Sequence, residues 1–365
     1  MLTSKGNKPF STNSQREEPT TIEDEEATTY ESAGTKASRE NGDKSSSTTP
    51  RKEAKLTIID GRDSVYSVGF LIDGMHIVSG GWDGKVRRWR MEDRQEVGIP
   101  MDTGSPIFNI AVSRDGRWVV SGTRDGAVTV WNAESHEKVV QYQGHAIDVR
   151  AVDISPDGTR IVTGSYDDTV CVWSRSTGQQ LLGPLQHDNL VVTAKFSPNG
   201  RLIATATWNR DSSHDGHLLV DFLIRVNSYF NNSFDWASDS KRLFALSRDG
   251  KIHCLDVLSG TTLSKWPIHS SINATCITLA GNNRFIAASA GRSISFWDTT
   301  TQEQVGLIIE HSHDIWTMAI SENYEFVTSG GRTISISDLR SILPSSYFDE
   351  VSALDGFTLS TQRST

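Results

Sequence analysis

The sequence predicts an all-β fold built from seven repeated units, because one short apolar pattern returns along it at a constant interval. Five segments with this pattern end at Trp89, Trp131, Trp173, Leu255 and Trp297. The intervals between these residues are 42, 42, 82 and 42, so one further unit fits inside the longest interval. A weaker copy follows over residues 333–337. An array with this period, made of short alternating runs, indicates a closed ring of small sheets, and we expect a seven-bladed β-propeller over residues 55–340.

Each unit contains turn residues at the spacing that four short strands require. The third unit shows this most clearly, since apolar runs over 149–155, 159–165, 169–173 and 179–185 are separated by short polar segments. Asp157-Gly158 lies between the first two runs, and similar Asp-Gly or Asn-Gly pairs recur in other units. Glycine supplies the positive φ that tight hairpins need. We therefore expect four antiparallel strands in each unit.

The two ends of the chain differ from the repeats. The first 50 residues contain 17 serines or threonines and few large apolar side chains. Such a segment buries too little apolar surface to offset the entropy lost on ordering, so we expect residues 1–54 to form a disordered tail. Residues 341–365 show no sustained period, and we expect a second loose tail there.

The fourth unit is shorter than its neighbours. Trp208 and Gly216 are separated by 8 residues, whereas the equivalent stretches of the third and fifth units span 12. This interval leaves no room for the third strand, so we expect an incomplete fourth blade. Either residues 217–224 move inward to replace this strand or the sequence has lost a few residues, and we favour the second explanation.

The third unit carries a residue set that resembles the WD-repeat (WD40) family, and the resemblance extends over roughly residues 55–340. In this family a histidine, a serine or threonine, an aspartate and a tryptophan form a buried structural network. The matching residues of the third unit are His145, Thr163, Asp167 and Trp173. The first and second units keep part of the set, namely Ser79, Asp83 and Trp89, and Ser121, Asp125 and Trp131. The fourth unit has His187 but Asn209 in place of the aspartate, and the last two units have Gly291 and Gly331 there.

The resemblance also implies how the ring closes. The last unit supplies only three strands, and an additional strand over residues 55–60 precedes the first unit. Members of the family commonly complete the last blade with the N-terminal strand, which removes two exposed sheet edges.

Composition and motifs argue against several classes of function. With 36 basic and 45 acidic residues the net charge is −9, which disfavours direct binding to nucleic acid. The sequence has no apolar run of the ~20 residues that a membrane-spanning helix needs, and no secretory leader. Three cysteines without a CxxC spacing fit a reducing compartment, so we expect a cytoplasmic or nuclear protein.

We find no catalytic motif and no cofactor motif. The pairs His214/His217 and His311/His313 have no convincing third metal ligand, so we expect no enzyme and no metal site.

Large aromatic residues and arginines recur at two positions of the repeat that open on one rim of the ring. They are Tyr66, Trp82, Phe108, Arg124, Arg150, Tyr166, Trp208, Arg248 and Trp316. Since these residue types dominate binding hot spots, we expect a non-enzymatic scaffold that docks peptides or proteins on this rim. Packing between neighbouring units is the alternative explanation of the same residues. The arginines favour an acidic or phosphorylated peptide. The alternative function is a substrate-receptor subunit of a ubiquitin ligase or of another multiprotein complex. Neither the partners nor the oligomeric state can be read from the sequence.

Overall fold

The computed structural model describes residues 56–59, 63–208, 219–220, 223–226, 230–247, 250–268 and 274–348. All of them belong to one compact unit, which spans Lys52–Thr365. The expected N-terminal tail over 1–54, and the C-terminal tail from residue 349 onward, lie outside the described residues.

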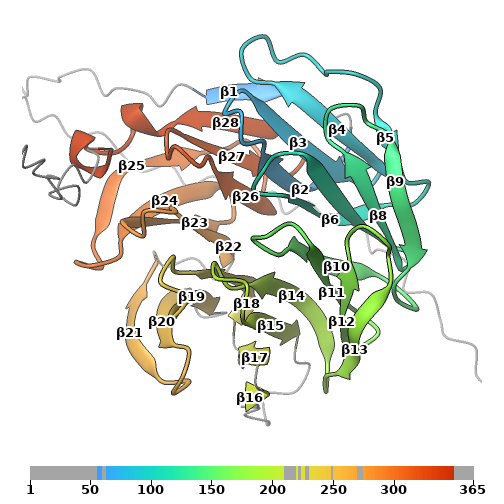
Figure 1. Cartoon of the computed structure of the whole chain (residues 1–365). Coiled ribbons are helices and arrows are strands. Elements are labelled where there is room, and N and C mark those ends of the chain that lie inside the picture. Colours follow the sequence, from blue (N-terminus) through green and yellow to red (C-terminus); the bar gives the residue numbers. More distant parts are fainter. Residues whose placement is uncertain are drawn as a thin grey trace, which may run out of the picture. The chain divides into compact units, whose positions relative to one another are not determined.

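Within the described part of the chain the strands pair into four-stranded sheets that follow one another around a ring, which makes this unit an all-β β-propeller (Figure 1). Six of the sheets are regular antiparallel blades. The first two consist of β2 (Val65–Phe70), β3 (His76–Gly81), β4 (Lys85–Arg90) and β5 (Met101–Asp102), and of β6 (Ile107–Val112), β7 (Trp118–Thr123), β8 (Ala127–Asn132) and β9 (Lys138–Gln143). The third consists of β10 (Val149–Ile154), β11 (Arg160–Ser165), β12 (Thr169–Ser174) and β13 (Gln180–Gln186).

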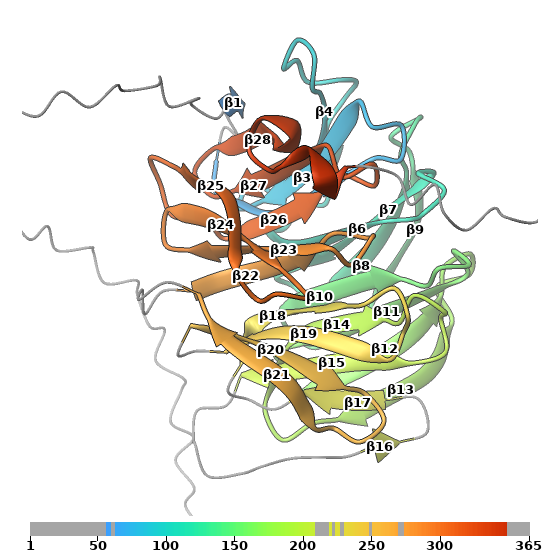
Figure 2. The same cartoon turned by 90° about the vertical axis from the view of Figure 1, so that its left-hand side faces the viewer.

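After an irregular sheet, two further regular blades follow along the chain. They are β18 (Phe230–Trp236), β19 (Arg242–Ser247), β20 (Lys251–Asp256) and β21 (Thr262–Pro267), and then β22 (Ala274–Leu279), β23 (Phe285–Ala290), β24 (Ser293–Asp298) and β25 (Gln304–Glu310). The last regular blade contains β26 (Thr317–Ile320), β27 (Phe326–Gly330) and β28 (Ile334–Asp338). Figure 2, turned by 90°, shows the sheets succeeding one another from β28 near its top to β16 and β17 at its bottom. The first strand of each sheet lies at the centre of the ring.

The last blade is completed by β1 (Leu56–Ile59), which pairs antiparallel with β28. The register places Leu56 opposite Ser337 and Ile59 opposite Ile334. This pairing confirms that the strand expected over residues 55–60 closes the ring, because it covers the edge of β28 that would otherwise remain open.

Small residues at the end of the second strand allow neighbouring sheets to approach closely. A Cβ atom added at Gly80 would lie 2.8 Å from a side-chain carbon of Ile107 in the next sheet. Gly122 and Gly164 have the same relation to Val149 and Val191, at 2.5 Å. The hydrophobic core therefore consists of clusters between adjacent sheets, and these glycines determine how tightly the sheets pack.

The irregular sheet is the fourth along the chain and has the strand order β14–β15–β17–β16. Here β14 (Leu190–Phe196) and β15 (Ile203–Trp208) are antiparallel, but β17 (Leu223–Val226) pairs parallel with β15. The short β16 (Leu219–Val220) pairs antiparallel with β17. Residues after 217 thus occupy the third position of the sheet. This agrees with inward movement of residues 217–224 and not with the loss of residues that we favoured. The chain first runs to the outer edge and then turns back, so the strand beside β15 has the opposite direction to that of a regular blade.

The packed structure extends beyond the boundary expected at residue 340. Two short 3-10 helices, η1 (Leu339–Ser341) and η2 (Ser345–Tyr347), follow β28. Ile342 and Leu343 between them are buried against the last two sheets. Residues 341–348 are therefore part of the propeller unit, because these apolar side chains remove surface from water there. No helix in the described part of the chain is long and apolar enough to span a membrane.

Candidate partner-binding rim and central channel

The four residues expected to form a network in the third sheet are hydrogen-bonded to one another. His145 Nδ1 lies 3.0 Å from Asp167 Oδ2, and His145 Nε2 lies 2.7 Å from Thr163 Oγ1. The indole Nε1 of Trp173 donates to the same hydroxyl at 2.8 Å. Burial lowers the pKa of His145, and the neighbouring Asp167 only partly offsets this effect. The imidazole is therefore neutral at physiological pH. It connects the loop before β10 to Thr163 in β11.

The first and second sheets keep the tryptophan end of this arrangement. Trp89 Nε1 donates to Ser79 Oγ at 2.8 Å, and Trp131 Nε1 donates to Ser121 Oγ at 3.0 Å. The aspartates have other partners in these sheets, since Asp83 accepts from Arg87 and Asp125 accepts from Thr123. These contacts connect residues of one sheet to one another.

Two further histidines, His187 and His311, occupy the position of His145. Only His187 was recognised at this position from the sequence. His187 Nε2 lies 3.0 Å from Thr205 Oγ1, and His311 Nε2 lies 3.4 Å from Ser329 Oγ. Each histidine precedes its hydroxyl partner by 18 residues, as His145 precedes Thr163, and this interval could have identified both.

Of the residues we considered as metal ligands, His214 and His217 lie outside the described residues. Within the described ranges no group of three His, Cys, Asp or Glu side chains is arranged to hold a metal ion.

Aromatic residues of three sheets lie together on the rim. The Tyr66 ring stacks on Trp316 with a centroid distance of 5.4 Å, and its edge contacts Phe108 at 5.6 Å and Trp82 at 6.3 Å. Tyr66 and Phe108 are half-buried, whereas Trp82 and Trp316 remain 42% and 38% exposed. Tyr66 is therefore the centre of one continuous aromatic surface, flanked by two accessible tryptophans.

Arginines extend this surface into the next sheets. Arg124 lies with its guanidinium carbon 5.4 Å from the centre of the Trp82 ring. Arg150 lies between two rings, 3.9 Å from the centre of Phe108 and 4.3 Å from that of Tyr166. The structure thus brings together seven of the nine expected rim residues. Arg248 and the side chain of Trp208 lie outside the described residues.

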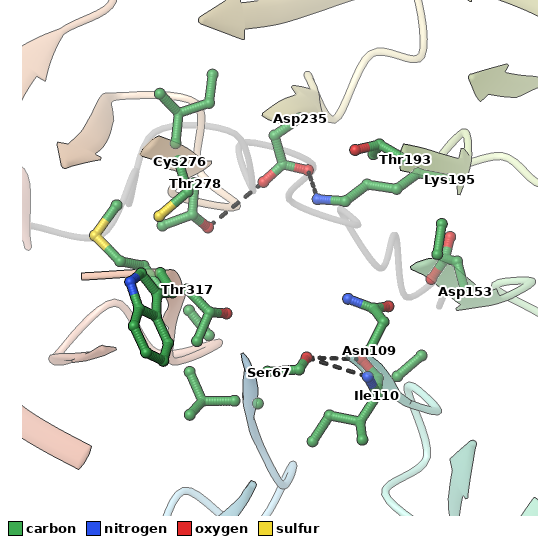
Figure 3. A pocket seen from close by; sticks show the side chains of 18 of the residues that line it. Ser67, Asn109, Ile110, Asp153, Thr193, Lys195, Asp235, Cys276, Thr278 and Thr317 are labelled. Carbon is green, nitrogen blue, oxygen red and sulfur yellow. Dashed lines mark hydrogen bonds and ion pairs between the residues drawn. The ribbon is translucent and has the colours of Figure 1, made fainter. Parts of the chain in front are cut away.

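The aromatic surface surrounds the mouth of a channel with a volume of about 1660 Å³. Five rim residues line its mouth, namely Tyr66, Phe108, Arg150, Tyr166 and Trp316. The channel lining also includes charged and hydroxyl side chains, and Figure 3 shows Lys195 reaching Asp235, with Asp153 farther along the wall.

Several of these polar side chains connect neighbouring sheets. Ser67 Oγ accepts a hydrogen bond from Ile110 N at 3.1 Å, and Asn109 Oδ1 accepts one from Val152 N at 3.0 Å. Asp153 Oδ2, in the third sheet, accepts a hydrogen bond from Phe196 N in the fourth sheet at 2.7 Å. Side chains of the innermost strands therefore satisfy backbone groups that have no partner within their own sheet.

The charged groups of the channel lie around the irregular fourth sheet. Lys195 Nζ donates to Asp235 Oδ1 at 3.2 Å. Burial raises the pKa of Asp153 to about 6, although the Phe196 N–H and Lys195 act in the opposite direction. Burial also disfavours the charged form of Lys195, but Asp235 and Asp153 outweigh it and raise the pKa of the amine. Burial raises the pKa of Cys276 to about 11. The amine and the thiol are thus both protonated at neutral pH, which leaves neither as an activated nucleophile.

Comparison with known proteins agrees with this geometry. The family model "WD domain, G-beta repeat" matches residues 54–90, 100–132, 136–174 and 179–220. Human WD repeat-containing protein 90 is 28% identical over 99 residues, which are 27% of this chain and 6% of that protein. The match therefore covers only a small part of the human protein. Four segments of the chain are therefore WD40 repeats, and the described sheets form a β-propeller.

Proposed function

We propose that the protein is a non-enzymatic scaffold that docks a partner protein or peptide on the rim around the channel mouth. WD40 propellers generally act as scaffolds for protein interactions. The observation that carries the proposal is the aromatic surface centred on Tyr66, in which Trp82 and Trp316 stay accessible. Exposed aromatic residues at the centre of a rigid surface are typical of binding hot spots. Their exposure of 42% and 38% leaves part of both indoles accessible to a partner.

The rim arginines refine the kind of partner. Both faces of the Arg150 guanidinium are covered by rings, and Asp148 Oδ2 lies 3.7 Å from its Nε. Arg124 is exposed beside Trp82 and is better placed to pair with a carboxylate or phosphate. We propose that an apolar or aromatic side chain of the partner supplies most of the affinity, and that an acidic or phosphorylated residue next to it pairs with Arg124.

We further propose that the irregular sheet is the fourth of seven blades, so that the ring has seven positions of which six are regular. The free thiols of Cys171, Cys254 and Cys276 support a reducing compartment, the cytoplasm or the nucleus, as the place of action. A substrate-receptor subunit of a ubiquitin ligase would use the same rim and differ only in the machinery that it recruits.

Affinity capture with the full chain, read by mass spectrometry, tests the proposal. The double variant Trp82→Ala/Trp316→Ala should lose partners that the wild type captures, with binding weakened at least tenfold. Ile99→Ala/Leu258→Ala is a matched control, because both side chains are highly exposed outside the rim. Retention of every partner by the rim variant would contradict the docking role. Recovery of ligase components with the wild type would favour the alternative function.

A further inference from the structure

The face of the ring opposite to the rim carries a strip of arginines. In each regular sheet the rim residues lie at the start of the first strand and after the second strand, so the turn between these strands is at the opposite end. In the second, third and fourth sheets these turns span 113–117, 155–159 and 197–202. On or beside them lie five arginines, here called the basic strip: Arg114, Arg117, Arg160, Arg175 and Arg201.

Contacts between sheets make the strip continuous. Arg175, in the turn after β12, lies with its guanidinium carbon 4.2 Å from the centre of the Trp118 ring in the second sheet. Arg160 Nη2 donates to the carbonyl of Gly200 in the fourth sheet at 2.8 Å. The arginines of the third sheet therefore reach both neighbours and connect Arg117 on one side with Arg201 on the other.

The charge of the strip is not cancelled locally. Two carboxylates lie within it, and they are only loosely paired: Asp115 is 3.9 Å from Arg117 Nε, and Asp157 is 4.0 Å from Arg160 Nη2. A hydrogen bond from Ser155 is the main cause that lowers the pKa of Asp157 to about 2, so this carboxylate is ionised. Five guanidinium groups against these two carboxylates, and against Glu134 and Glu137 in the turn between β8 and β9, leave a small excess of positive charge, on a chain whose net charge is −9.

Three of the five arginines of the basic strip are exposed, and Arg160 and Arg175 are half-buried. The side chain of Arg117 is 77% exposed, and Arg114 and Arg201 are exposed as well. Arg150 on the rim, by contrast, has both of its faces covered. Glu134 and Glu137 lie in the turn between β8 and β9, next to Arg117, since Ala133 N donates to the carbonyl of Arg117.

We propose that the basic strip is a second docking surface, separate from the rim, for an Asp/Glu-rich segment of a partner protein. The arginines lie in separate turns of three sheets and do not converge on one point. They therefore fit carboxylates distributed along an extended peptide better than a single phosphate group. The negative charge of the whole chain disfavours a nucleic acid or an anionic membrane as the occupant.

Fluorescence anisotropy with the full-length protein tests the proposal. The probe is a labelled peptide of alternating glutamate and serine, and the control peptide has glutamine in place of glutamate. We expect the glutamate peptide to bind at low salt, to dissociate as salt increases, and to bind at least tenfold more weakly to Arg117→Glu/Arg201→Glu. Arg292→Glu, a charge reversal at a 64% exposed side chain outside the strip, should retain the wild-type affinity.

Several results would overturn the proposal. These are equal binding of the two peptides, no binding at all, or loss of binding in Arg124→Glu on the rim but not in the strip variant. Tighter binding of a phosphoserine peptide, of single-stranded DNA or of phosphatidylserine vesicles would assign the strip to a different occupant. If Arg117→Glu/Arg201→Glu lowers the thermal midpoint, the exposed Arg114→Glu replaces it and should weaken binding in the same direction.

Discussion

The guanidinium carbon of Arg150 lies 3.9 Å from the centre of the Phe108 ring, so a cation held on an aromatic face joins the third sheet to the second at the rim. Tyr166 covers the opposite face of the same guanidinium at 4.3 Å. Because the contacts of Tyr66 continue this arrangement to Trp316, the rim is a connected surface whose shape depends on interactions between sheets.

Arg150→Ala should therefore reduce stability as well as partner binding. Loss of two half-buried cation–π contacts is expected to lower the free energy of unfolding by about 1–2 kcal/mol. Arg124→Ala, at an exposed residue beside Trp82, should change it by less than about 0.5 kcal/mol. Denaturant unfolding of both variants measures the difference, and an unchanged stability of Arg150→Ala would show that these contacts contribute nothing.

Trp173→Ala should strongly destabilise the propeller. The substitution removes a buried ring and leaves Thr163 and His145 with fewer partners, which together suggest a loss of roughly 3–5 kcal/mol. Trp316→Ala is the matched control, since this indole is 38% exposed and its loss should cost far less. Thermal denaturation compares the two, and a wild-type midpoint for Trp173→Ala would contradict the role of the network.

His311 and His145 should differ in importance although they occupy equivalent positions. His145 contacts Thr163, Asp167 and Thr169, so His145→Ala should cost roughly 2–3 kcal/mol. The hydrogen bond that is resolved for His311 is a longer one to Ser329, and Gly331 stands where an aspartate is expected, so His311→Ala should cost about 1 kcal/mol. Chemical denaturation of both variants tests this order, and the reverse order would be inconsistent with the geometry.

Asp153 should make the stability depend on pH between about 4 and 6. Its pKa in the folded protein is raised to about 6, above the unfolded value, so its contribution is fully present at low pH and is lost as pH increases through about 6. Asp153→Asn keeps an oxygen acceptor for Phe196 N and removes this dependence. Asp235 remains to pair with Lys195 in the variant. The thermal midpoint of Asp153→Asn, relative to the wild type, should therefore increase with pH over this range. A difference that is constant from pH 4 to 7 would exclude the raised pKa.

Two truncations should separate the closing strand from the segment before it. A chain that begins at Lys55 should keep the wild-type thermal midpoint, because β1 is still present to pair with β28. A chain that begins at Gly61 lacks β1 and should unfold at a clearly lower temperature and associate through the open edge of β28. Calorimetry and light scattering measure both effects. Equal midpoints for the two chains would mean that the pairing adds no stability.

Local patterns were enough to predict the strands, and the resemblance to the WD-repeat family implied how the ring closes. The regular interval between Trp89, Trp131 and Trp173 identified the repeat. In each repeat the tryptophan has the same role, because its indole donates a hydrogen bond to a hydroxyl ten residues earlier on the neighbouring strand. The fourth sheet could not be predicted in the same way. Its strand β17 pairs parallel with β15, and this pairing depends on the open edge of β15 that the chain meets as it folds. Residues 341–348 escaped prediction for a similar reason, as Ile342 and Leu343 have no period and find their partners only in sheets formed earlier in the chain.

The sequence by itself determined which residues form strands, where the turns lie and which positions of the repeat face the rim, because these properties depend on residues close together along the chain. Only the tertiary structure decided which arginines remain accessible. Arg150 and Arg117 look equivalent as sequence letters, yet the first is enclosed by rings from two sheets and the second is 77% exposed. This difference arises because the environment of a long side chain depends on neighbouring sheets that lie about one repeat away in the sequence and come into contact only when the ring closes.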